Sequence, residues 1–215
     1  MKLYFSPLAC SMATRIALYE AGTSANFIYV DIHTALQDRL LENGTDYHAI
    51  NPMGQVPAIE TDDGDLLTEN PVVLQYVADL YPESGLAYPG GMQRYHLQEW
   101  LNFISTELHK ATFIPLLGRD NPDQVKSFAR GKMALRFGHL EDHLHNREFL
   151  LDRFTIADAY LVTVLNWSQY AGVDLSEWPA VKTYFDRIQK RPAVSRAMAE
   201  ETAAYAEEMA RSKAA

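Results

Sequence analysis

The stretch INPMGQVPAIETDDGDLLTENPVVLQYVADLYP, residues 50–82, predicts two short strands followed by a helix. Inside it, VPAIETDDGDLLTE predicts two short strands, because an Asp-Gly pair (Asp63 and Gly64) between apolar runs is typical of a tight hairpin. The segment ENPVVLQYVADLY predicts a helix, with Asn70 as its N-cap and Pro71 at the first helical position. A strand pair that leads directly into a helix is therefore expected.

The segments before this stretch predict the rest of a small α/β domain. Residues 2–5 predict a strand, and Met12, Ile16 and Tyr19 then recur at helical spacing. NFIYVDI, residues 26–32, is rich in aromatic and β-branched side chains and predicts a second strand. We therefore expect an α/β domain over residues 1–80.

The segments after the stretch predict helices only. Residues 81–91, YPESGLAYPGG, hold two prolines and three glycines and predict a linker. Beyond them, over residues 92–215, apolar residues recur at helical spacing, which predicts an all-helical domain. Four apolar residues of this domain either line a pocket for a hydrophobic substrate or pack in its core: Phe113, Ile114, Leu116 and Leu117.

Composition narrows the classes of partner. The formal net charge of −9 argues against nucleic acid and against anionic membrane surfaces, which attract basic patches. Cys10 is the only cysteine, so no internal disulfide is possible and a reducing compartment is favoured. The N-terminus has no pattern of a signal peptide, and no apolar run approaches the length of a membrane span. These features predict a cytoplasmic protein.

Two features suggest a binding edge, and each has a plain structural alternative. Pro57 stands where a strand begins; a cis bond after Val56 would leave the Val56 backbone groups free to pair with an extended peptide, whereas a trans proline would only mark the strand edge. A helix that begins at Asn70 directs free N–H groups outward, which suits a carboxylate, and Glu69 beside it suits an ammonium group. Ordinary capping explains Asn70 equally simply.

Four segments together resemble the cytosolic glutathione transferases, and the bacterial beta class in particular, because Cys10 and Ser11 stand where that class has its cysteine. These segments are LYFSPLACSMATRIALYEAG, the stretch of residues 50–82, RYHLQEWLNFISTELHK and FLLDRFTIADAYL. The resemblance implies a thioredoxin-like N-terminal domain, an all-α C-terminal domain and a homodimer. It also implies glutathione as co-substrate, a small electrophile as second substrate, and no metal.

The resemblance also implies roles for particular residues. Cys10, Ser11 and His109 would act at the glutathione sulfur, and Glu107 would reach across the dimer. The glutathione-binding residues would be Gln55, Val56, Pro57, Glu69, Asn70, Asn102, Glu107 and Lys110. The class often carries a lysine after the second strand, where this chain offers only His33 and Arg39. Helical spacing places Asn102 and His109 on one face, since they are seven residues apart.

The chemistry of the family reaction requires a thiolate. A free thiol has a pKa near 8.5, so only about 3% is ionised at neutral pH. Lowering this pKa by about two units takes roughly 2.7 kcal/mol. A helix N-terminus with one or two hydrogen bonds supplies that amount, and Cys10 and Ser11 lie at such a terminus. Cys10 is then a donor to the glutathione sulfur, a partner in a mixed disulfide, or a buried apolar filler.

Two further motifs are interpreted as structural. Thr155 and Asp158 form a capping box before an apolar run, so Asp158 is expected to serve stability. His139 and His143 in HLEDHLH match no zinc signature and are expected at a solvated helix end.

The predicted function is therefore conjugation of glutathione to small hydrophobic electrophiles. One alternative is a glutathione-dependent thiol-disulfide oxidoreductase or lyase that uses Cys10 covalently. Another is a protein of the same fold that binds ligands or partners without catalysis. Removal of the Cys10 thiol separates conjugation from exchange, and turnover of a chromogenic electrophile separates both from simple binding.

Overall fold

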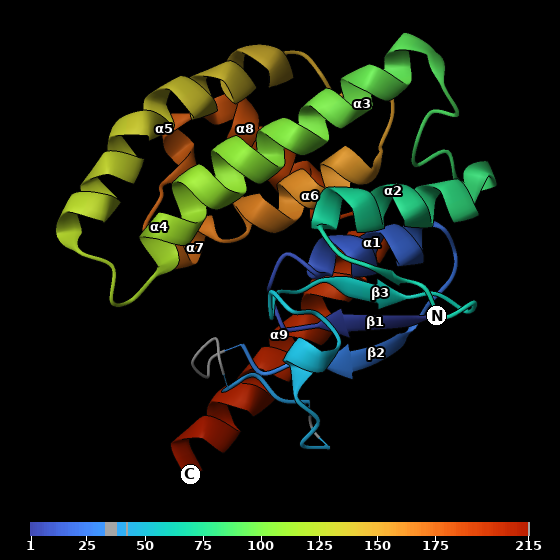
Figure 1. Ribbon diagram of the computed structural model, residues 1–215. Helices are drawn as coiled ribbons and strands as arrows, with labels where there is room; N and C mark the ends of the chain where they lie inside the picture. The colour runs from blue at the N-terminus through green and yellow to red at the C-terminus, as the bar shows by residue number, and fades with distance from the viewer. Residues whose placement is uncertain (33–37, 42, 215) are drawn as a thin grey trace. The chain divides into compact units, whose positions relative to one another are not determined.

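The computed structural model describes residues 1–32, 38–41 and 43–214, without the side chains of 212–214 (Figure 1). The chain forms two compact units. The first comprises Met1–Ser84 with Pro192–Ala215, and the second comprises Gly85–Arg191. Within the described residues, no helix combines the length and the apolar character that crossing a membrane requires.

The first unit is built on a four-stranded sheet with the order β2-β1-β3-β4. Its strands are β1 (Lys2–Phe5), β2 (Asn26–Tyr29), β3 (Ala58–Glu60) and β4 (Leu66–Leu67). β1 runs parallel to β2 and antiparallel to β3, and β4 pairs antiparallel with β3. The predicted hairpin is confirmed: the Thr61 N–H donates to the Asp65 carbonyl at 2.8 Å, and Gly64 adopts the left-handed φ of 89° that this turn needs.

Helices α1 (Met12–Glu20) and α2 (Asn70–Leu80) follow β1 and β4, and the short 3₁₀ helices η2 (Tyr47–Ala49) and η3 (Pro82–Ser84) complete this part of the chain. α2 begins one residue earlier than predicted. Glu69, not Asn70, is the N-cap, because the Glu69 carbonyl accepts the N–H groups of Val72 and Val73 at 2.8 and 3.0 Å. The predicted role of Asn70 as N-cap is therefore wrong, and Asn70 is the first helical residue.

The first unit also contains the C-terminal helix α9 (Pro192–Ala214), which packs against α1. The sequence pattern assigned residues 192–215 to the helical domain, so the structure differs from the prediction here. Val194 and Ala197 are fully buried in the contact, and Arg15 of α1 pairs with carboxylates of α9. Helical spacing identified the helix but carried no information about the unit it joins.

The second unit is helical throughout. Its elements are α3 (Gly91–Phe103), the π-helix η4 (Ile104–Phe113), α4 (Ile114–Leu117), α5 (Asp123–Leu144), α6 (Ile156–Leu165), α7 (Ser168–Ala171), η5 (Leu175–Glu177) and α8 (Pro179–Ile188). Leu97, Phe113 and Phe137 are fully buried in its core, and Leu116 is 8% exposed. Ile114 is 44% exposed and so remains available to a ligand.

Two predicted structural motifs lie in this unit. Asp158 accepts the Thr155 N–H at 2.9 Å at the start of α6, as the predicted capping box requires. His139 and His143 lie near the end of α5, as predicted, with His139 exposed and His143 half-buried. Their rings contact the Trp100 ring at centroid distances of 5.5 and 4.4 Å, so aromatic packing between α5 and α3 uses both.

Candidate active site

The turn before β3 presents the backbone predicted to bind a peptide. The bond between Val56 and Pro57 is cis, which is the first of the two alternatives left open by the sequence. The Gln55 carbonyl accepts hydrogen bonds from the Tyr47 hydroxyl at 2.9 Å and from the Asn51 amide at 2.7 Å. Both donors are buried, and burial raises the pKa of Tyr47, so its hydroxyl stays protonated. These two hydrogen bonds to the Gln55 carbonyl therefore hold the turn in place.

Cys10 lies against this turn. It stands in the loop between β1 and α1, is 8% exposed, and its Sγ donates to the Val56 carbonyl at 3.0 Å. α1 begins two residues later, so the thiol lies near the positive end of a helix dipole. The structure thus brings together two of the predicted residues, one for the sulfur and one for the peptide backbone.

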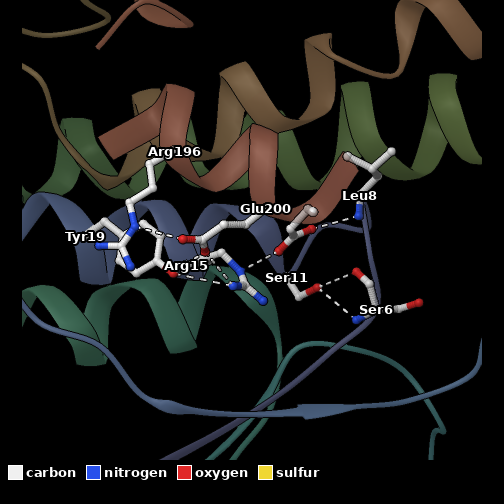
Figure 2. Close-up of polar contacts among 8 residues, drawn as sticks. Ser6, Leu8, Ser11, Arg15, Tyr19, Arg196 and Glu200 are labelled. Carbon is white, nitrogen blue, oxygen red and sulfur yellow. Dashed lines mark hydrogen bonds and ion pairs between the residues drawn. The ribbon is translucent and has the colours of Figure 1, made fainter. Parts of the chain in front are cut away.

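Ser11 is occupied by the loop itself. It is fully buried, and its Oγ accepts the Ser6 N–H at 3.3 Å and donates to the Ser6 carbonyl at 3.2 Å (Figure 2). The single hydroxyl proton is therefore committed to Ser6. The structure gives Ser11 the role of closing the loop, which differs from its predicted role as a donor to the glutathione sulfur.

The start of α2 presents an unpaired buried amide. Asn70 is 5% exposed, and its Oδ1 accepts the Thr14 hydroxyl at 3.3 Å, which joins α2 to α1. Its Nδ2 has no hydrogen-bond partner among the described residues. A buried donor without an acceptor is unfavourable, and the group fits a carboxylate ligand at a helix N-terminus. Glu69 beside it is exposed, with a left-handed φ of 63°.

Four of the predicted residues lie in the second unit, on α3 and η4: Asn102, Glu107, His109 and Lys110. Asn102 is exposed and its amide donates to the Gln98 carbonyl, whereas His109 is 4% exposed. The prediction that these two residues share one helical face is therefore wrong. The reason is that the chain changes from α to π geometry at Ile104, so residues seven apart are no longer two α-helical turns apart.

His109 has a protein partner of its own. Its Nδ1 lies 2.7 Å from the Tyr160 hydroxyl, and burial lowers its pKa to about 3. The imidazole is therefore neutral at physiological pH and offers a polar group but no positive charge.

The remaining two residues of η4 differ in their surroundings. Glu107, predicted to reach across a dimer, pairs within its own unit with Arg136 at 2.6 Å. Lys110 is exposed.

Arg39 is one of the two basic residues that the sequence offers after β2, and it contacts the protein itself. Arg39 donates from Nη1 to the Gly54 carbonyl, and burial lowers the pKa of its guanidinium. Its side chain therefore supports the turn that carries Gln55. His33, the other basic residue that the sequence offers there, lies outside the described residues.

Sequence reasoning missed the supports of the turn, Tyr47 and Asn51. They lie in a polar segment without clear periodicity, and an aromatic residue and an asparagine shortly before a Gly-Gln-Val-Pro turn were the only signal available. Among the described residues, no group of three or more His, Cys, Asp or Glu side chains is arranged to hold a metal ion.

Comparisons with known proteins match this architecture. The family models described as Glutathione S-transferase, N-terminal domain and Glutathione S-transferase, C-terminal domain match residues 9–80 and 103–192. The chain is 41% identical to glutathione S-transferase GstA of Escherichia coli O157:H7 over 203 residues, which cover 94% of this chain and 98% of that protein.

Two solved structures extend the match to three dimensions. A sphingomonad glutathione S-transferase complexed with glutathione is 40% identical, with a TM-score of 0.87. The match covers 94% of this chain and 99% of that protein. The bacterial beta class glutathione S-transferase of Sphingomonas chungbukensis is 38% identical, with a TM-score of 0.86 and coverages of 94% and 98%. The family, fold and class expected from the motifs are confirmed, and the chain belongs to the glutathione S-transferase family.

Proposed function

We propose that this glutathione transferase binds glutathione on its first unit and adds the thiolate to small hydrophobic electrophiles. The cysteinyl backbone of the tripeptide would pair with Val56 at the turn before β3. The γ-glutamyl carboxylate would lie at the start of α2, and the sulfur beside Cys10 at the N-terminal end of α1. Homodimerisation and a cytoplasmic location belong to the same proposal.

The observation that carries the proposal is the buried Asn70 Nδ2, which has no acceptor among the described residues. A carboxylate at this position would satisfy that donor and would also meet the positive end of the α2 dipole. Glu69, exposed beside it, supplies the opposite charge for the α-ammonium group of the same ligand end.

The sulfur position follows from Cys10 and Val56. The Val56 carbonyl already accepts the Cys10 thiol, and its second lone pair is available to the peptide N–H of a bound ligand. A ligand held in this way brings its own thiol to the same loop. There the positive end of the α1 dipole favours the thiolate, which attacks the electrophilic carbon.

Asn70→Asp tests the proposal by calorimetry with glutathione. The substitution keeps the Oδ1 that Thr14 bonds but replaces the donor with a negative charge. We expect the dissociation constant to rise about tenfold or more, which is at least roughly 1.4 kcal/mol. Asn26→Asp adds the same charge at an exposed asparagine of the same unit and should leave affinity unchanged. Equal affinities for the wild type and Asn70→Asp would contradict the proposal.

A further inference from the structure

A carboxylate of the C-terminal helix reaches the loop that carries Cys10. Glu201 of α9 is fully buried, and its two oxygens have different partners. Oε2 accepts the backbone N–H of Leu8 at 2.7 Å, and Oε1 accepts Arg15 Nε at 2.9 Å. One side chain thus connects three segments of the first unit: the loop after β1, helix α1 and helix α9.

The residue held by Glu201 has an unusual backbone conformation. Leu8 has a φ of 59°, in the left-handed region that residues with a Cβ rarely adopt. Leu8 is also buried, so its N–H would lack water if Glu201 were withdrawn. Two residues further along, Cys10 places its Sγ on the Val56 carbonyl. The conformation of Leu8 therefore bears directly on where the thiol lies.

Arg15 in turn fixes Glu201 in place. The Arg15 guanidinium is almost fully buried, and its carbon lies 3.8 Å from the centroid of the Phe27 ring. Burial raises the pKa of Glu201 to about 7, against the attraction of Arg15. The hydrogen-bond geometry nevertheless suits the ionised form, because each oxygen accepts from a separate donor.

The neighbouring Glu200 provides a natural comparison. It shares the same arginine, since its Oε2 lies 3.1 Å from Arg15 Nη1, and it also accepts from Tyr19 and Arg196 (Figure 2). None of these three partners belongs to the loop of residues 6–11. The two glutamates thus share Arg15 but differ in burial, since the Glu200 side chain is 38% exposed and that of Glu201 is fully buried. Of the two, only Glu201 has a described hydrogen bond to that loop.

We propose that Glu201 is a positioning residue for catalysis: by bonding the Leu8 N–H it holds the loop of residues 6–11 in the conformation that places the Cys10 thiol against Val56. The inference rests on the proposed function only in that Cys10 then faces the bound glutathione sulfur. Ser11 joins the two ends of the same loop through its bonds to Ser6, and Glu201 holds the loop at Leu8 between them.

The test compares Glu201→Gln with the matched variant Glu200→Gln. An amide at position 201 offers one acceptor to two donors, so Leu8 or Arg15 loses its bond. The first readout is the rate at which iodoacetamide alkylates Cys10 without glutathione, which is specific because the chain has no other cysteine. We expect Glu201→Gln to raise this rate about tenfold and Glu200→Gln to leave it unchanged.

The second readout is turnover with glutathione and a chromogenic aryl halide. Glu201→Gln should lower kcat by about tenfold with a smaller change in KM, because the sulfur end is misplaced while the Asn70 end is intact. Glu200→Gln should keep the wild-type kcat, even if its melting temperature falls as far as that of Glu201→Gln. If Glu201→Gln does not fold, Glu201→Asp serves in its place, since the shorter side chain retains the charge but no longer spans to Leu8.

Equal alkylation rates in the wild type, Glu201→Gln and Glu200→Gln would overturn the inference, as would equal losses of kcat in the two variants. Alkylation requires no glutathione, so this result does not depend on the proposed binding site. A wild type that binds no glutathione would instead remove the proposed function and leave the loop measurement valid.

Discussion

His109 shows how burial sets the chemistry of a single side chain. Its Nδ1 faces the Tyr160 hydroxyl, and its ring packs against the Trp167 ring at a centroid distance of 4.9 Å. Burial lowers its pKa to about 3, whereas an exposed histidine in the unfolded chain titrates near 6.5. The unfolded state therefore binds the proton more tightly. The stabilising contribution of neutral His109 is fully present above pH 6.5 and is lost as the pH falls towards 3.

This sign gives a prediction about acid stability. Between pH 7.5 and pH 5, His109 should remove about 2 kcal/mol from the free energy of unfolding. Urea unfolding of the wild type and of His109→Gln at both pH values measures this, because glutamine is polar but does not titrate. We expect the wild type to lose about 2 kcal/mol more than the variant over this range. An identical pH dependence for both proteins would show that His109 is not buried in its neutral form.

At the scale of elements, Asp158 joins the start of α6 to two neighbouring segments. Its carboxylate accepts the N–H and hydroxyl of Thr155 at 2.9 and 3.1 Å, the Leu150 N–H at 2.9 Å and the Tyr184 hydroxyl of α8 at 2.8 Å. Of these hydrogen bonds, only the one from the Thr155 N–H to Asp158 belongs to an ordinary capping box. The aspartate therefore fixes the segment before α6 and the position of α8 as well as the helix start.

Removing this carboxylate should cost stability rather than specificity. Asp158→Ala leaves several buried donors without an acceptor, so we expect a loss of about 3 kcal/mol in chemical denaturation. The substrate preference of the remaining folded enzyme should be that of the wild type. Asp142→Ala, at an exposed aspartate of α5, is the control and should change stability by less than about 0.5 kcal/mol. A shift in substrate preference in Asp158→Ala would contradict a purely structural role.

Local signals account for the parts of the fold that the sequence predicted well. The Asp63 and Gly64 turn and the Asn70 and Pro71 helix start depend on neighbours in the chain, so they could be predicted to within a residue. The contacts of Glu201 depend on tertiary packing, because an Ala- and Glu-rich helix is also compatible with a solvated position. The face of the helix on which His109 lies was also predicted wrongly, because helical spacing assumes α geometry throughout and η4 is a π-helix.

In the candidate site, too, some residues could be predicted from local motifs, whereas the contacts of others depend on the folded structure. Motif resemblance identified Cys10, Val56 and Asn70, and the structure brings all three into the first unit. The motif resemblance did not predict that the Ser11 hydroxyl is committed to Ser6, because that bond depends on how the loop folds back on itself. At the scale of the whole molecule, the site therefore combines residues recognisable by motif with supports that only the folded chain reveals.

We propose that glutathione lies with its sulfur beside Cys10 and its γ-glutamyl carboxylate on Asn70. A crystal structure of the protein with glutathione bound would locate both ends of the ligand. We predict hydrogen bonds from the ligand's cysteinyl N–H to the Val56 carbonyl and from Asn70 Nδ2 to the carboxylate, with the ligand sulfur adjacent to Cys10 Sγ. Density for glutathione elsewhere, with Asn70 Nδ2 still lacking an acceptor, would contradict this binding mode.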